Sequence, residues 1–263
     1  ALTYDANGNL ASGGGWSYTH HGNSRLVGVS GPGSVAASFA RDGRNRDVKR
    51  TLNGVTTYLI YDGWNRVADH RSRWRLGGDS PQANPAGRDE LERASQYDAA
   101  GALTIQYIHG PRWDDHRSPG GLGGEPAAAG PPLWRGRDEQ ERASQILAKV
   151  TPAATTFPLP DALGSTIAVT DANGAVLERV YYFDAFGTPT FRSGAGVPLP
   201  DTSTGTRFLF TGREWLARLG LYDYRNRTYS ARLGRFVQTD PIRFSAGDVN
   251  LYRYVSNSPA QFI

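Results

Sequence analysis

The chain has 263 residues, 38% hydrophobic and 11% aromatic, with 32 Gly and 16 Pro, which favours a folded protein of many short strands. The absence of Cys excludes disulfides, thiol catalysis and thiolate zinc sites, and no apolar run is long enough to span a membrane. The net charge of +4 comes from Arg residues scattered among acidic ones, which argues against nucleic acid as a partner.

The most frequent local pattern, Asp-x-x-Gly, begins near the N-terminus and occurs five times. An Asp carboxylate can accept hydrogen bonds from backbone N–H groups just ahead of it, and Gly can adopt the left-handed conformation that closes a short loop. Strand-forming residues flank these units, as in GVTTYLIYD and GALTIQYIHG. We therefore predict structural turns at Asp5–Gly8, Asp98–Gly101, Asp161–Gly164, Asp171–Gly174 and Asp184–Gly187.

The segments between these turns are predicted to be strands. In residues 176–183, one face carries Val176, Glu178, Val180 and Tyr182. A single hairpin cannot bury its apolar face, whereas stacked hairpins can. The sequence thus predicts a mainly β fold in which Tyr-Asp hairpins build a curved or spiralling sheet.

Two stretches depart from the strand-and-turn pattern. GRDELERASQ at Gly87–Gln96 recurs at Gly136–Gln145 with nine of ten positions identical, and both copies have the composition of short helices. A Pro/Gly/Ala-rich loop lies between them at Arg117–Pro132. We expect β-repeats over residues 1–110, an insertion over 111–156 and a C-terminal unit over 157–263. Within FPLP, Pro158 and Pro160 predict a strand that is interrupted or lies at a sheet edge.

The C-terminal unit carries specific motifs. They are DALGS, YYFDAFG, FTGRE, GLYDYRNRTYSARLGRFVQTDPI and NLYRYVSNSP. This C-terminal sequence resembles the RHS-repeat-associated core of the Rhs/YD-repeat family. The family includes bacterial polymorphic toxins, C components of insecticidal toxin complexes and the animal teneurins. The resemblance implies that the sheet is part of a hollow β-shell, which encloses a C-terminal toxin in many members and is closed by the core.

The resemblance also implies an intramolecular aspartyl protease built on two Asp-Pro motifs. One is Asp240-Pro241, and the resemblance points to a nearby Arg, for which Arg232 and Arg235 are the predicted residues. Arg225 and Arg227 are alternatives. Two carboxylates that share a proton can position a water and protonate a leaving amide.

The second Asp-Pro follows NSPxxF in the family, and the sequence stops at Ile263, within NSPAQFI. Arg243 also stands where the family usually has Gly, and an Arg beside Asp240 would favour its ionised form. The enzymatic activity expected of this chain is therefore at most that of a single-turnover aspartyl autoprotease. A structural Asp-Pro turn is the competing interpretation.

The leading hypothesis is a structural, encapsulating fragment of a bacterial Rhs/YD-repeat protein that is secreted or displayed on the cell surface. The autoproteolytic core that releases a toxin is the first alternative, and a surface module that binds glycan or protein through exposed aromatic rings is the second. Expected partners are the rest of a larger polypeptide, copies of the chain, a toxin cargo or a glycan. No cofactor is predicted, although His109, His116, Asp114 and Asp115 could in principle form a metal site.

Overall fold

A computed structural model of the chain describes residues 1–43, 46–62, 65–71, 93–97, 103–109 and 146–260. Sixteen strands form one sheet, here called the outer sheet, in which each strand pairs with its neighbours in sequence. The strands are β1 (Thr3–Tyr4), β2 (Leu10–Gly13), β3 (Trp16–His20), β4 (Leu26–Gly31), β5 (Val35–Arg41), β6 (Asp47–Leu52), β7 (Val55–Asp62), β8 (Asn65–Arg71), β9 (Arg93–Tyr97), β10 (Leu103–His109), β11 (Ile146–Val150), β12 (Thr155–Pro160), β13 (Thr166–Thr170), β14 (Val176–Tyr182), β15 (Pro189–Ser193) and β16 (Pro198–Leu199).

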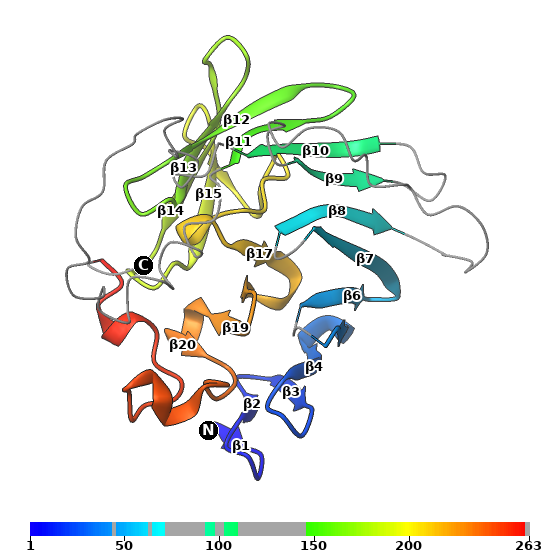
Figure 1. The fold of residues 1–263 in the computed structure, drawn as a ribbon. Coiled ribbons are helices and arrows are strands. Elements are labelled where there is room, and N and C mark those ends of the chain that lie inside the picture. Colours follow the sequence, from blue (N-terminus) through cyan, green and yellow to red (C-terminus); the bar gives the residue numbers. More distant parts are fainter. Residues whose placement is uncertain (44–45, 63–64, 72–92, 98–102, 110–145, 261–263) are drawn as a thin grey trace, which may run out of the picture.

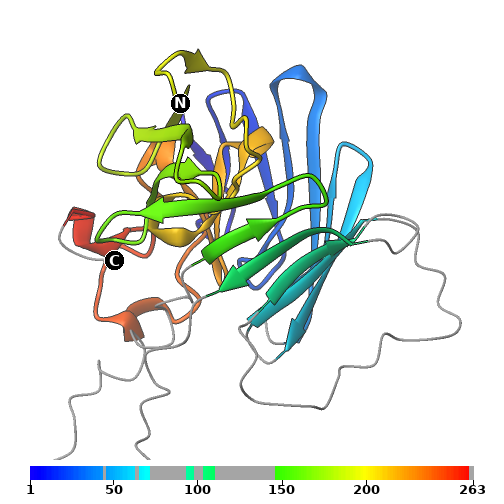
Figure 2. The same ribbon diagram turned by 90° about the horizontal axis from the view of Figure 1, so that it is seen from above.

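The outer sheet curves around a smaller unit formed by residues 201–260, here called the inner unit (Figures 1 and 2). Its four-stranded sheet consists of β17 (Glu214–Leu216), β18 (Leu221–Tyr224), β19 (Arg227–Ser230) and β20 (Arg235–Phe236). Short 3-10 turns precede, join and follow these strands, and a further one precedes β5 in the outer sheet. They are η1 (Pro32–Ser34), η2 (Phe210–Gly212), η3 (Ala217–Leu219), η4 (Ala231–Leu233), η5 (Arg243–Ala246) and η6 (Val255–Asn257).

Alternating side chains of the outer sheet face the inner unit. In β14, Glu178 and Val180 are buried while Leu177, Arg179 and Tyr181 are exposed, so the face that carries Glu178 and Val180 is the inward one. β5 alternates in the same way. This period of two is what a strand buried on one side produces. The fold is therefore mainly β, with antiparallel sheets, as predicted.

The inner unit packs against both arms of the curved sheet. Its residues Leu219, Leu221 and Val237 share one hydrophobic cluster with the N-terminal strands. A second cluster joins Val180 and Phe191 of β14 and β15 to the aromatic side chains of the inner unit. The partly buried apolar faces of the repeats are thus covered by the last part of the chain.

One helix prediction is wrong where the structure can test it. Arg93–Gln96, the end of the first duplicated segment, lie in strand β9. Backbone groups of β9 pair with β10 on one side and with β8 on the other, in the parallel pair of this otherwise antiparallel sheet. Helix propensities differ by only about 0.7 kcal/mol per residue among ordinary residues, so pairing on both sides outweighs them. The second copy, Gly136–Gln145, lies outside the described residues.

The proline-containing strand behaves as an edge. β12 pairs with β11 only at Thr155 and Thr156, whereas residues 157–160 pair with β13 alone. Pro lacks a backbone N–H donor, and this explains why the other side of the segment has no strand partner among the described residues. Within the described ranges, no helix has the length and apolar character needed to cross a membrane.

Candidate functional site

The described Asp-x-x-Gly units share one hydrogen-bond pattern. The Asp Oδ1 atom accepts the backbone N–H groups two and four residues ahead, with N···O distances of 2.8–3.2 Å at Asp5, Asp161, Asp171 and Asp184. The Gly at the fourth position has a positive φ of 80–91° in each unit. The carboxylate thus fixes the turn, while Gly supplies a conformation that a Cβ would strain. Asp98 and Gly101 lie outside the described residues.

Three of these turns bind the inner unit. In the first, the fully buried Asn9 accepts hydrogen bonds from the backbone N–H and hydroxyl of Thr239, at 3.2 and 3.3 Å, and the Tyr252 hydroxyl donates to the Gly8 carbonyl. In the second, Ser165 Oγ accepts the Thr211 N–H at 3.0 Å.

The third turn, at residues 184–188, is held by two tyrosine hydroxyls. Tyr229 donates to the carbonyl of Phe186, and Tyr222 donates to that of Gly187, each at 2.9 Å. Both phenols lie in the aromatic cluster of the inner unit, and burial raises their pKa well above the ordinary value of about 10. They therefore remain hydrogen-bond donors throughout the physiological pH range.

A buried histidine lies beside the first turn. The side chain of His20 is fully buried, its Nδ1 is 3.8 Å from Asp5 Oδ2, and neither ring nitrogen has a hydrogen-bond partner among the described residues. Burial lowers the pKa of His20 to about 4, although the Asp5 carboxylate opposes this shift. For Asp5, burial raises the pKa, but hydrogen bonds from Asn9 and Asn7 outweigh it and the net shift is downward.

Asp240 forms a local turn on the inner unit. Its Oδ1 accepts the Ile242 N–H at 3.0 Å, and Arg243 N–H donates to its backbone carbonyl. Its Oδ2 lies 2.9 Å from Arg227 Nη1, and the guanidinium carbon of Arg227 lies 3.6 Å from the centre of the Phe236 ring. Both carboxylate oxygens are thus engaged by donors from within the inner unit.

The two arginines predicted to accompany Asp240 make other contacts. Arg235 donates to the Tyr4 hydroxyl at 3.0 Å, and its guanidinium carbon lies 4.5 Å from the centre of the Tyr252 ring. Arg232 lies on η4 and lines a cavity with Trp16, where its Nη2 is 3.4 Å from the Gly13 carbonyl. Of the alternatives, Arg227 contacts Asp240, whereas the Arg225 backbone N–H donates to Asp223.

A buried ion cluster joins β6 to the inner unit. Arg50, 9% exposed, lies 3.1 Å from Glu214 Oε2 and 2.9 Å from Asp223 Oδ2. Arg207 also contacts Glu214, and Asp47 lies 3.5 Å from Arg50. Removing one member of such a cluster leaves buried charge uncompensated, which typically costs about 3–5 kcal/mol of folding free energy.

Glu178 holds the segment that enters the inner unit. It is fully buried, and it accepts hydrogen bonds from the backbone N–H groups of Ser203 and Thr204 and from the hydroxyls of residues 202–204. The Nζ of Lys149 donates to the Thr204 carbonyl beside it. The sequence reasoning did not assign Glu178, Asn9 or Arg50 a role, although an acidic residue on an apolar strand face was a usable signal for Glu178.

Most of the residues of the remaining predicted site lie outside the part of the chain that the structure describes. Strand β10 ends at His109, while His116, Asp114 and Asp115 lie outside the described residues. Among the residues that are described, no group of three His, Cys, Asp or Glu could hold a metal ion.

Comparison with known proteins gives related sequences but no family-model match. The chain is 25% identical over 264 residues to the tRNA3(Ser)-specific nuclease WapA of Bacillus spizizenii, covering 98% of the chain and 9% of that protein. It is 24% identical to the tRNA nuclease WapA of Bacillus subtilis with the same coverage. Over 56 residues, 21% of the chain, it is 41% identical to salivary gland surface protein 1 of Aedes aegypti, of which it covers 2%.

Solved structures share the fold. The crystal structure of TcdB2-TccC3 matches 99% of the chain and 11% of the solved chain, with a TM-score of 0.53 and 16% identity. The Photorhabdus luminescens Tc holotoxin pore matches 99% of the chain and 10% of the solved chain, with the same TM-score and identity. The chain thus resembles the WapA proteins in sequence and shares its fold with these Tc toxin structures. The chain spans about a tenth of the length of these proteins.

Proposed function

We propose that the chain is a structural segment of a larger Rhs-related polypeptide, in which the outer sheet forms part of an encapsulating wall and the inner unit closes it. The proposal rests on the hydrogen bonds between the turn at residues 5–8 and the inner unit, which involve Asn9, Thr239 and Tyr252. Two ends of the curved sheet are thereby joined through one element. Residues 157–263 would be the RHS-repeat-associated core, following repeats at 1–110 and an insertion at 111–156.

The partners would be the remainder of the larger polypeptide, copies of the chain and a toxin cargo, and the location would be the bacterial surface or the medium. The names of the WapA relatives, which are tRNA nucleases, support a toxin context for the whole polypeptide. Within this chain, three of the repeated turns exchange hydrogen bonds with the inner unit, and this supports a scaffold because these donors and acceptors hold two elements together.

The test uses the polypeptide extended by its natural sequence beyond Ile263. The wall model predicts that the downstream segment resists a protease that digests the same segment expressed alone. Substituting Arg50→Met, which breaks the ion cluster between wall and inner unit, should remove this protection. The matched substitution Arg179→Met, on the exposed face of β14, should preserve it. Equal digestion of the attached and free segments would contradict the wall model.

A second candidate is the aspartyl autoprotease. Its support is that the Asp240 side chain is 14% exposed and is paired with Arg227, which matches an Asp with a nearby Arg in the resembling family. The extended polypeptide and its Asp240→Asn variant are compared by intact mass. Cleavage of the unsubstituted protein alone supports autoproteolysis, whereas two intact proteins leave Asp240 with a structural role. Asp171→Asn, in an exposed turn, is the control.

The surface-binding candidate depends on exposed aromatic rings. Phe183 and Tyr181 are exposed on the outer sheet, at 83% and 49%, whereas Trp16 and Trp215 face the interior cavity. Retention on immobilised polysaccharide that is lost in a Tyr181→Ala, Phe183→Ala double variant would favour this candidate. Unchanged retention or no retention would remove these two rings as its basis.

A further inference from the structure

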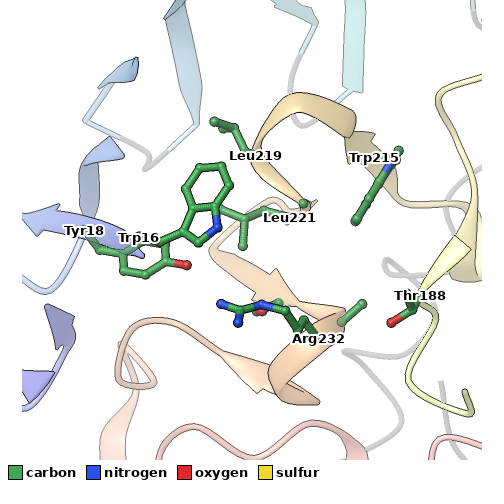
Figure 3. A pocket seen from close by; sticks show the side chains of 10 residues that line it. Trp16, Tyr18, Thr188, Trp215, Leu219, Leu221 and Arg232 are labelled. Atoms are coloured by element: carbon green, nitrogen blue, oxygen red, sulfur yellow. The ribbon is translucent and has the colours of Figure 1, made fainter. Parts of the chain in front are cut away.

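A cavity of about 240 Å³ lies between strand β3 and the inner unit. Figure 3 shows Trp16 and Trp215 on opposite sides of it, with the Arg232 side chain between them. Tyr18 and Leu221 add further apolar surface, and the hydroxyl-bearing residues Thr188 and Ser230 complete the polar part of the lining. The cavity thus combines flat aromatic walls with one cation and two hydroxyls.

The positions of the two indoles are set by their neighbours. Trp16 lies against Gly31, where a Cβ would approach the ring to 2.3 Å, and Trp215 packs on Tyr222 with ring centres 4.6 Å apart. These contacts belong to the two hydrophobic clusters on either side of the cavity. The walls are therefore held by packing before any ligand enters, which reduces the entropy lost on binding.

The cation in the cavity has no carboxylate partner in the part of the chain that the structure describes. Arg232 makes its polar contacts with the Gly13 carbonyl and with Tyr18, and no Asp or Glu in the described part of the chain lies within 4.0 Å of it. The same Ala-Arg-Leu-Gly sequence occurs one strand pair earlier, where Arg218 of η3 is exposed. A guanidinium presents a planar fork of donors that matches a carboxylate with two parallel hydrogen bonds.

From this geometry we propose that the cavity is a binding site for a small aromatic carboxylate. The ring would lie between the indoles, and the carboxylate would accept hydrogen bonds from Arg232 and from Ser230 or Thr188. The volume falls just below the roughly 300–1,000 Å³ of drug-sized sites, so one ring fits and a nucleotide does not. The proposal is independent of the encapsulating role, since the cavity is complete within the chain.

The probe is para-fluorobenzoate, followed by fluorine NMR with the full chain. We expect saturable binding with a dissociation constant of about 0.1–1 mM, in keeping with a ligand of this size. The neutral isostere para-fluorobenzamide should bind at least about tenfold more weakly, because it cannot form the charged hydrogen bonds.

Variants separate the site from general surface binding. Arg232→Gln should weaken benzoate binding about tenfold or more, and Arg232→Lys should weaken it less because the charge remains. Arg218→Gln, in the matching exposed motif, should leave the affinity unchanged. A melting curve for each variant confirms that it is folded.

Three results would overturn the proposal. These are no saturation below about 10 mM, equal affinity for benzoate and benzamide, and an equal effect of the Arg218 and Arg232 substitutions. If Arg232→Gln fails to fold, Trp16→Leu provides the second variant, since it removes one aromatic wall and should also weaken benzoate binding.

Discussion

Two turns with the same sequence, Asp-Ala-Asn-Gly, have different surroundings in this protein. The turn at 5–8 is followed by the buried Asn9 and is bound by Thr239 and Tyr252. The turn at 171–174 is followed by the exposed Ala175 and, within the described residues, makes no hydrogen bond to the inner unit. The carboxylate geometry inside the two turns is the same, so the difference lies in what surrounds them.

The strand order explains the difference. Antiparallel neighbours place successive turns at opposite ends of the strands. The parallel pair β8–β9 is the exception, because these two strands run in the same direction. Following the directions through the sheet puts the β1–β2, β12–β13 and β14–β15 turns at one rim and the β13–β14 turn at the other. The three turns that bind the inner unit all belong to the first rim. One local unit thus serves as a plain hairpin turn or as a docking point, according to its rim.

The largest expected loss of stability is that of an alanine at Gly187, and Gly174 is its matched control. In Gly187→Ala, the added Cβ would lie 2.3 Å from the Phe210 ring at a φ of +91°, whereas at Gly174 (φ +83°) no atom lies within 4 Å. The left-handed backbone costs about 1–2 kcal/mol in each variant, and overpacking adds about 1–3 kcal/mol at Gly187. Urea unfolding should therefore show a much larger loss for Gly187→Ala. Equal losses would mean that the inner unit does not constrain this turn.

Acid should weaken the first turn through His20. Its pKa of about 4 in the folded protein is lower than the ordinary 6.5, so the unfolded chain binds the proton more tightly. This contribution is complete above about pH 6.5 and is lost as the pH falls towards 4, by about 3 kcal/mol. His20→Phe should remove this part of the pH dependence of the unfolding free energy, and His21→Gln, at an exposed neighbour, should retain it. An unchanged slope in His20→Phe would assign the acid sensitivity to other groups.

Asn9, which follows the turn at 5–8, is expected to contribute more to the unfolding free energy than Asn173, which lies inside the turn at 171–174. Asn9→Ala removes the acceptor for Thr239 and the side-chain donors to Asp5, and should lower the unfolding free energy by about 2 kcal/mol. Asn173→Ala removes an exposed side chain and should change it by less than about 0.5 kcal/mol. Denaturant midpoints measure both, and a loss at Asn173 as large as that at Asn9 would contradict the two-rim comparison.

The smallest effect concerns a single hydroxyl. Tyr222→Phe leaves the Gly187 carbonyl without its donor while the ring packing remains, and should cost about 1 kcal/mol. Tyr181→Phe, on the exposed face of β14, is the matched control and should be neutral. Thermal unfolding of the two variants gives the comparison. A neutral Tyr222→Phe would indicate that water replaces the hydroxyl at this carbonyl.

Local rules were sufficient for much of the outer sheet. The mainly β fold and the interrupted or edge character of the strand at Pro158 and Pro160 follow from side-chain alternation and the missing proline donor. The helix predicted for Gly87–Gln96 is wrong at Arg93–Gln96, because amino-acid composition reports only the preference of the isolated segment. Strands β8 and β10 on either side of it are brought there by the sheet as a whole.

The chain's own sequence thus determined most strands and turns. The hydrogen bonds that an Asp carboxylate accepts from the backbone N–H groups two and four residues ahead are local properties, and so is a period-two apolar face. Only the tertiary structure decided which rim binds the inner unit, that Arg227 rather than Arg232 meets Asp240, and that Arg50 pairs with Glu214, 164 residues away. Those contacts depend on the curvature of the sixteen-stranded sheet and on strands β8 and β9 running in the same direction. No short stretch of residues encodes either property.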